Sequence, residues 1–256
     1  MDAEWISRSF ERVLLRRDRT ITVALLILVV GSSWAYILLG GGLEMSSMMT
    51  ARGTWDLDYS IVMVVMWWVM MLAMMLPSAA PMILMFVSLN RTRSDGSIGA
   101  VLAFVTAYVL SWGAFSVLAT LLQWGLEKTG FLSSMMASTN AVLGASLLIA
   151  AGIWQLTPLK HACLRHCRSP LNFFLHKWRN GPSGAFKMGL EYGVFCLGCC
   201  WVLMTLLFYG GVMNLWWITG LALYVLVEKV APAGHWISHG TGVLLIASGL
   251  WIFVAS

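Results

Sequence analysis

The sequence predicts an all-α integral membrane protein, a polytopic bundle of about seven transmembrane helices with its amino terminus inside and its carboxyl terminus outside. Composition is the first reason, because 59% of the 256 residues are hydrophobic and only 11% are charged, whereas soluble domains carry about 25% charged residues. The second reason is the length of the charge-free stretches, since a helix of about 20 residues crosses a bilayer core of about 30 Å. These stretches cover 20–43, 60–90, 96–126, 129–159, 192–227 and 230–256.

The distribution of basic residues predicts the orientation. With the amino terminus inside, all of the 16 lysines and arginines except Arg52 and Lys128 fall on the cytoplasmic side, where membrane proteins concentrate such residues. The net charge of +5 is then a consequence of topology. We therefore expect the lipid bilayer as a partner and no nucleic acid, while the oligomeric state and any partner subunit stay open.

The chain is expected to form one membrane domain over 1–256, beginning with a short interfacial helix at 1–19. Apolar residues recur there at helical spacing among arginines, which is the pattern of a helix lying at the membrane surface. The first membrane helix follows at about 21–39, and it exceeds the length of a signal-peptide core. The sizeable insertions are an outer loop at 40–59 and an inner loop at 158–187.

The remaining membrane helices are expected at about 60–89, 98–124, 136–157, 188–209, 213–228 and 236–254. Pro77 and Pro81 fall inside the first of these and predict a kink, because proline lacks the backbone N–H and clashes with the preceding turn. The uncharged stretch 192–227 is too long for one crossing. Its centre, YGGVMN at 209–214, has turn chemistry, so we divide the stretch into two helices.

The helix at 60–89 is predicted to have a methionine-rich face. Its proposed ligands are Met70, Met71, Met74 and Met75. Thioethers are soft ligands that suit Cu⁺. The alternative is helix packing, because methionine is a good helix former that fills irregular gaps. Three further methionines, Met45, Met48 and Met49, lie in the outer loop, where packing explains them less well.

A cysteine cluster is predicted on the helix at 188–209, where GLEYGVFCLGCCWVLM contains Cys196, Cys199 and Cys200. Spacings of three and four residues place these thiols on neighbouring positions of one helix surface. Thiolates bind soft metals, although cysteine is also a small residue that buries readily. Glu191 precedes the cluster, and it is either a functional ionisable group in the membrane or an interfacial residue paired with Lys187.

Further potential ligands open the inner loop, in TPLKHACLRHCRSP at 157–170. The side chains are those of His161, Cys163, His166 and Cys167, and such short spacings on one segment rarely fill a tetrahedral zinc site. His235 and His239, four residues apart near the last helix, have a metal-binding spacing. We interpret that pair as interfacial.

Three segments, 67–83, 157–170 and 189–204, resemble a bacterial family of predicted metal-binding integral membrane proteins whose function is unknown. The resemblance implies a multi-pass protein of the inner membrane with a metal site, and it supplies no reaction or substrate. The matching motif positions are Met70, Met74, Met75, Pro77, Cys163, Cys167, Glu191, Cys196, Cys199 and Cys200.

We therefore predict a membrane protein that binds or moves a soft transition metal, with copper as Cu⁺ the first choice. The predicted metal ligands are Cys196, Cys199, Cys200, Glu191, Met70, Met71, Met74, Met75, Cys163 and Cys167. One alternative is a thiol–disulfide or electron-transfer protein using the same cysteines, and another is a structural membrane subunit without metal. No P-loop, haem c or zinc-protease motif is present, so no enzymatic reaction is predicted.

Overall fold

The computed structural model describes residues 2–39, 55–92, 97–132 and 140–255, and in these ranges it contains helices and no β-strand. The all-α class is thereby confirmed. The helices are α1 (Asp2–Leu38), α3 (Leu57–Arg91), α4 (Ile98–Lys128), α5 (Ala141–Leu156), α6 (Pro158–Arg168), α7 (Pro170–Lys177), α8 (Gly181–Thr205), α9 (Leu207–Gly210), α10 (Leu215–Val230) and α11 (Gly234–Ala255). The outer-loop methionines Met45, Met48 and Met49 lie outside the described residues.

Among the described residues, five helical segments are long and apolar enough to cross a membrane. They are Arg19–Leu38, Leu57–Arg91, Ile98–Lys128, Gly181–Gly210 and Gly234–Ala255. Helices α5 and α6, bent by 65° at their junction, make a sixth if the pair is one broken span. The seventh predicted crossing corresponds to α10, whose 16 residues extend about 24 Å at 1.5 Å per residue, which is shorter than the bilayer core. The orientation stays a prediction.

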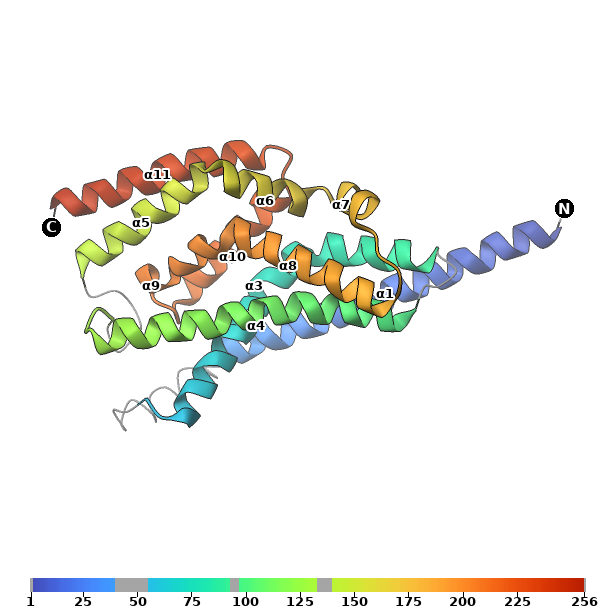
Figure 1. The fold of residues 1–256 in the computed structure, drawn as a ribbon, viewed down its shortest axis with the longest axis horizontal. Coiled ribbons are helices and arrows are strands. Elements are labelled where there is room, and N and C mark those ends of the chain that lie inside the picture. The colour runs from blue at the N-terminus through green and yellow to red at the C-terminus, as the bar shows by residue number, and fades with distance from the viewer. Residues whose placement is uncertain (1, 40–54, 93–96, 133–139, 256) are drawn as a thin grey trace.

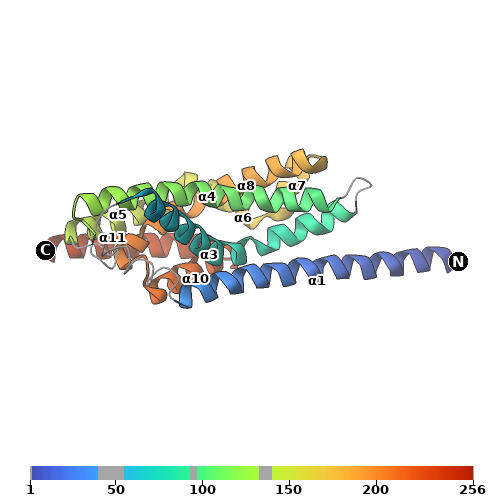
Figure 2. The same cartoon turned by 90° about the horizontal axis from the view of Figure 1, so that it is seen from below.

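The amino-terminal segment differs from the expectation of a separate interfacial helix at 1–19. It continues into the first membrane helix, so α1 is one helix from Asp2 to Leu38. Between Asp2 and Val30 there is no glycine or proline, and so nothing in the sequence stops the helix. Figures 1 and 2 show α1 along one side of the bundle with its amino-terminal part extending beyond the other helices.

Helix α3 runs through the centre of the protein and contains both Pro77 and Pro81. Figure 2 shows that it changes direction along its length, as expected where proline removes a hydrogen bond from the helix. Its methionines and aromatic residues are mostly buried. This helix therefore supplies much of the core.

The predicted turn at 209–214 is confirmed. Helix α9 ends at Gly210, and Gly211 has φ +93°, a conformation that glycine adopts without steric cost. The side chain of Asn214 then accepts hydrogen bonds from the backbone of Trp216 and Trp217 at 3.1 and 3.3 Å. This cap starts α10.

Glycines allow two pairs of helices to approach closely, α4 with α8 and α5 with α11. A β-carbon on Gly189 or Gly193 of α8 would collide with α4, at the Phe104 carbonyl and the Ser111 side chain respectively. A β-carbon on Gly152 of α5 would lie 2.7 Å from the Gly242 carbonyl of α11. Figure 1 shows α5 and α11 side by side as one layer of the molecule.

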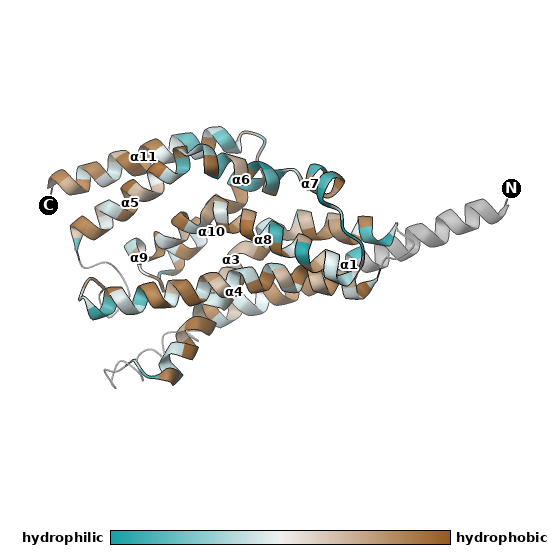
Figure 3. Ribbon diagram, in the orientation of Figure 1, coloured by the Kyte–Doolittle hydropathy of each residue, from teal (hydrophilic) through white to brown (hydrophobic). Residues whose placement is uncertain are grey.

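The inner loop predicted at 158–187 contains α6 and α7. Helix α5 ends at Leu156 because Pro158 disfavours a helical conformation at Thr157, and the Thr157 hydroxyl then accepts from the Lys160 backbone N–H at 3.3 Å. The resulting bend directs α6 against α8. Hydrophilic residues gather along α6, α7 and the first turns of α11 (Figure 3).

The last residue of α6 is tied to the end of α10. The Arg168 guanidinium donates hydrogen bonds to the backbone carbonyls of Ala231 and Pro232. These carbonyls lie directly after α10, and that of Ala231 also accepts from the Gly234 backbone N–H at 3.1 Å. Arg168 thus connects the helix that contains Cys163 and Cys167 to the helix that contains Lys229.

Candidate metal site

The three cysteines of α8 lie together in the interior, as their spacing predicts. Cys196, Cys199 and Cys200 are fully buried. The Cys199 and Cys200 thiols both donate to the Cys196 carbonyl, at 3.0 and 2.9 Å, so that they lie one turn along the same helix surface. All five cysteines of the chain are free thiols in the structure.

Helix α6 brings the two inner-loop cysteines to the same place. Cys167 is buried, and its side chain lies close to those of Cys196 and Cys199. Cys163 is half-buried, and its sulfur rests on α8 at Gly198, where a β-carbon would approach it to 2.7 Å. Two segments some 30 residues apart in the sequence therefore contribute all five thiols to one region, which we call the thiol cluster.

A methionine from α3 reaches the thiol cluster. The Met75 sulfur lies 4.0 Å from the Cys200 sulfur. Met70, Met71 and Met74 are also buried on α3 and belong to the surrounding core. The structure thus places Met75 beside a thiol, while the packing alternative stays open for the other three.

A buried lysine completes the surroundings of Cys196. The Lys229 ammonium nitrogen lies 2.9 Å from the Cys196 sulfur and 3.2 Å from the Ser78 hydroxyl, and the residue is only 5% exposed. The Tyr108 hydroxyl approaches the same sulfur at 3.4 Å. The sequence placed Lys229 on the cytoplasmic side, just after a helix expected to end at 228, whereas in the structure it lies within α10 and its side chain is buried. The signal was available, because an ionisable residue at the end of an apolar helix is a functional candidate.

Glu191 lies among cations rather than beside a thiol. Its Oε1 accepts a hydrogen bond from Arg179 at 2.7 Å, and its Oε2 lies 3.5 Å from the Lys177 nitrogen. The carboxylate is 28% exposed. This arrangement matches the interfacial alternative, with Arg179 and Lys177 in place of the expected Lys187.

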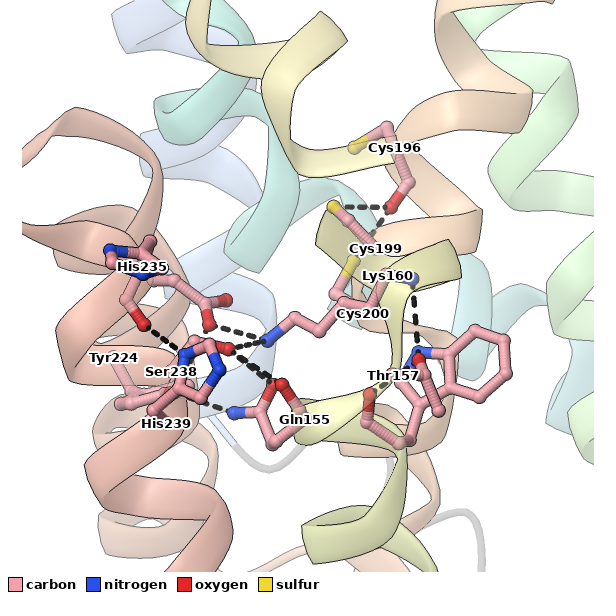
Figure 4. A network of polar contacts seen from close by, with 12 residues as sticks. Gln155, Thr157, Lys160, Cys196, Cys199, Cys200, Tyr224, His235, Ser238 and His239 are labelled. Carbon is pink, nitrogen blue, oxygen red and sulfur yellow. Dashed lines mark hydrogen bonds and ion pairs between the residues drawn. The ribbon is translucent and has the colours of Figure 1, made fainter. Parts of the chain in front are cut away.

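A second buried polar network, which sequence reasoning missed, lies next to the thiol cluster (Figure 4). Lys160 of α6 forms an ion pair with Glu228 of α10, both fully buried, and also donates to the Ser238 hydroxyl at 3.0 Å. Tyr224 donates to Glu228 at 3.2 Å, and Gln155 donates to Tyr224 at 2.5 Å. Glu228 and Lys229 therefore face two different polar clusters from adjacent positions of α10.

The histidines of two separate motifs come together beside this network. The rings of His161 and His239 stack with their centroids 4.6 Å apart and an angle of 8° between their planes. The ring centroid of His235 lies 5.0 Å from that of His239. His166 stacks instead on Phe195. Within the described part of the chain, no three or more side chains of His, Cys, Asp or Glu are arranged as a metal-binding group.

A Cu⁺ site can be formed by fewer than three such side chains when a thioether is also present. Sets of thiolates and thioethers suit this soft ion. Cys196, Cys200 and Met75 offer two thiols and one thioether in a buried position. The donor chemistry of the cluster therefore fits Cu⁺ better than a harder ion.

Comparison with known proteins identifies the family. A family model described as copper chaperone, PpoB2, matches residues 64–252, which contain every residue of the thiol cluster together with Met75 and Lys229. No curated protein and no solved structure matches the chain. The match supports the metal-related part of the resemblance noted in the sequence. With most of its length covered by that model, the chain belongs to the PpoB2 copper chaperone family.

Proposed function

We propose that this protein is an integral membrane copper carrier that holds Cu⁺ in the thiol cluster, with Cys196, Cys200 and Met75 as its ligand set and Cys167 and Cys199 beside it. The observation that carries the proposal is the meeting of thiols from α6 and α8 with a thioether from α3 inside the helix bundle. Packing alone does not require five soft donor side chains in one buried region. Family membership supports copper as the ion.

The charges around the cluster favour a monovalent ion. Lys229 is a cation held against Cys196, and a charge inside a bilayer is costly unless it is balanced. Two thiolates, one Cu⁺ and one ammonium group sum to zero. A divalent ion at the same place would require a further thiolate. The proposed site therefore discriminates by charge as well as by ligand softness.

Binding is coupled to proton release, because a thiol must lose its proton to become a ligand. Each sulfur that changes from thiol to thiolate on loading gives one proton to the buffer, and copper keeps its +1 charge. No oxidant or reductant takes part. The apparent affinity for Cu⁺ should therefore increase as the pH rises through the range in which the cluster loses protons.

The test is copper retention by the purified, reduced protein under anaerobic conditions. Wild-type protein in detergent should retain Cu⁺ through desalting, as measured by elemental analysis, and a variant with alanine at Cys196, Cys199 and Cys200 should lose it. Loss of a group that only supports a ligand typically costs about 10–100-fold in metal affinity, so the loss of the ligands themselves should cost more. A wild-type protein that retains no copper, or a triple variant that retains as much as wild type, would contradict the proposal.

A matched pair of methionine variants tests the thioether separately from packing. Met75→Leu should weaken Cu⁺ binding in competition with a chromogenic chelator, since leucine has no soft donor. Met82→Leu is the control, because Met82 is also buried on α3 and the swap conserves volume. Such swaps cost below about 1.5 kcal/mol in stability. Equal affinities for the two variants would remove Met75 from the ligand set.

The thiol–disulfide alternative is disfavoured by burial. Redox-active cysteines need access for the attacking thiolate, whereas four of the five cysteines here are buried. Alkylation separates the two functions. Ligation predicts that Cys196, Cys199 and Cys200 are protected by bound Cu⁺ and react after chelation. Protection that appears with oxidant and ends with reductant, without any chelator, would favour the redox function.

A further inference from the structure

We infer that Cys163 is the access thiol of the cluster, the sulfur through which Cu⁺ passes between the aqueous phase and the buried ligands. This inference rests on the proposed copper function and adds a route to it. The route has two steps, from an external donor to Cys163 and from Cys163 to the sulfurs of Cys199 and Cys167. Accessibility, contact and helix geometry each support it.

Accessibility distinguishes Cys163 from the other thiols. It is half-buried, whereas Cys167, Cys196, Cys199 and Cys200 are buried. Its helix, α6, has the sequence PLKHACLRHCR, with five basic or imidazole side chains in 11 residues. Figure 3 shows this part of the molecule as one of its hydrophilic regions. A water-soluble copper complex therefore meets the Cys163 sulfur before it meets any other sulfur of the cluster.

Contact between Cys163 and α8 depends on a glycine. The Cys163 sulfur would lie 2.7 Å from a β-carbon at Gly198 and its own Cβ 3.5 Å from it. A glycine at this position lets the sulfur rest directly on α8, one residue before Cys199.

Helix geometry places the second receiving sulfur one turn away. Cys163 and Cys167 are four residues apart on α6, the spacing at which side chains are neighbours on a helix. Cys167 in turn lies close to Cys196 and Cys199 in the buried part of the cluster. A Cu⁺ ion on Cys163 is thus adjacent to two members of the buried set, and no large movement of α6 is required to pass it on.

The transfer is a ligand exchange that balances without redox chemistry. In the first step, the bond between Cu⁺ and the donor's thiolate breaks as a bond to the Cys163 sulfur forms, and the Cys163 proton goes to the departing donor. In the second step, Cys199 or Cys167 binds the ion and gives its proton back to Cys163. Copper stays monovalent throughout. Release follows the same steps in reverse.

The rate of copper removal tests this route. Copper-loaded protein in detergent is mixed with excess bathocuproine disulfonate, a water-soluble Cu⁺ chelator, and its coloured complex is followed in time. Cys163→Ser should slow removal by about tenfold or more, the lower end of what loss of a ligand-shell group costs a metal site. Loading is by long dialysis, so that slow uptake does not limit the amount of copper bound.

Two further variants separate the sulfur from its surroundings. Gly198→Ala keeps every sulfur but inserts a β-carbon at the contact, and it should also slow removal. Alanine is a better helix former than glycine, so the helix itself is not weakened. Ser169→Ala is the control, because Ser169 is exposed directly after α6 and its hydroxyl makes no cap hydrogen bond. It should release copper at the wild-type rate.

A hydrophilic maleimide provides a test that does not depend on copper. In the native apo protein Cys163 should be the thiol that reacts first, as located by mass spectrometry. The route is overturned if another cysteine reacts first or if Cys163→Ser releases copper at the wild-type rate. It is also overturned if Cys163→Ser holds no copper after long dialysis, since Cys163 would then be a resident ligand. A wild-type protein without copper would contradict the proposed function instead, while the labelling order would still test access.

Discussion

Replacing Cys196 by alanine should destabilise the copper-free protein mainly through Lys229 and much less through the lost sulfur. Lys229 is 5% exposed, and its ammonium nitrogen lies 2.9 Å from the Cys196 sulfur. Its other hydrogen-bond partner, the Ser78 hydroxyl at 3.2 Å, cannot carry a compensating negative charge. Removing Cys196 therefore leaves a buried cation without its nearest source of negative charge.

The magnitude follows from the two parts of the change. Removing one partner of a buried ion pair costs about 3–5 kcal/mol, and the void left by a single sulfur adds about 1 kcal/mol. Neighbouring thiols take over part of the balancing charge, which places the expected loss for Cys196→Ala near the lower end, at about 3 kcal/mol. Lys229→Met removes the cation and leaves a neutral thiol, at a cost of about 1 kcal/mol.

A double variant tests whether the cost of Cys196→Ala comes from the unpaired charge of Lys229. With both residues replaced there is no unpaired charge, so Cys196→Ala combined with Lys229→Met should cost about 1–2 kcal/mol, well below the sum of the single changes. The assay is equilibrium unfolding in mixed micelles, followed by tryptophan fluorescence. Cys163→Ala combined with Lys229→Met is the control pair and should be additive. If the Cys196 and Lys229 effects add within about 0.5 kcal/mol, the charge argument is refuted.

Three further predictions use other parts of the fold. Lys160→Met leaves the fully buried Glu228 carboxylate unpaired and should lower the free energy of unfolding by about 3–5 kcal/mol, most of it regained on adding Glu228→Gln. Gly152→Val should separate α5 from α11, because even a β-carbon would lie 2.6 Å from Ile246; a variant melting as late as wild type would contradict this packing. A reporter fused within 158–187 should be cytoplasmic, and an external reporter would overturn the orientation inferred from basic residues.

The helix positions could be read from the sequence because apolar length, proline and turn residues act locally. The number of crossings could not, since α10 fits a charge-free stretch but has only 16 residues. Charge counting also assumes that every lysine lies outside the bilayer. The Lys229 side chain is instead buried inside the bundle, against Cys196 from another helix, and no residue near position 229 in the sequence reveals that partner.

The candidate site was likewise predictable where its residues share one helix, and not where they come from different helices. Spacing on one helix predicted that Cys196, Cys199 and Cys200 would share a surface, and they do. Contacts between helices, such as Met75 with Cys200, depend on how the bundle packs and are not visible in a single sequence. For the same reason Glu191 was named as a ligand, although its cationic partners are brought close only by the fold.

The link from Arg168 to the end of α10 has a mechanical consequence. Two carbonyls after α10 receive hydrogen bonds from this one guanidinium, so moving α6 outward would break both of these hydrogen bonds at once. Cys167 and Lys229, which approach the α8 cysteines from α6 and α10, are thereby fastened to each other. Within the proposed copper function, this link favours exchange of the ion by rotation of side chains over an outward movement of α6.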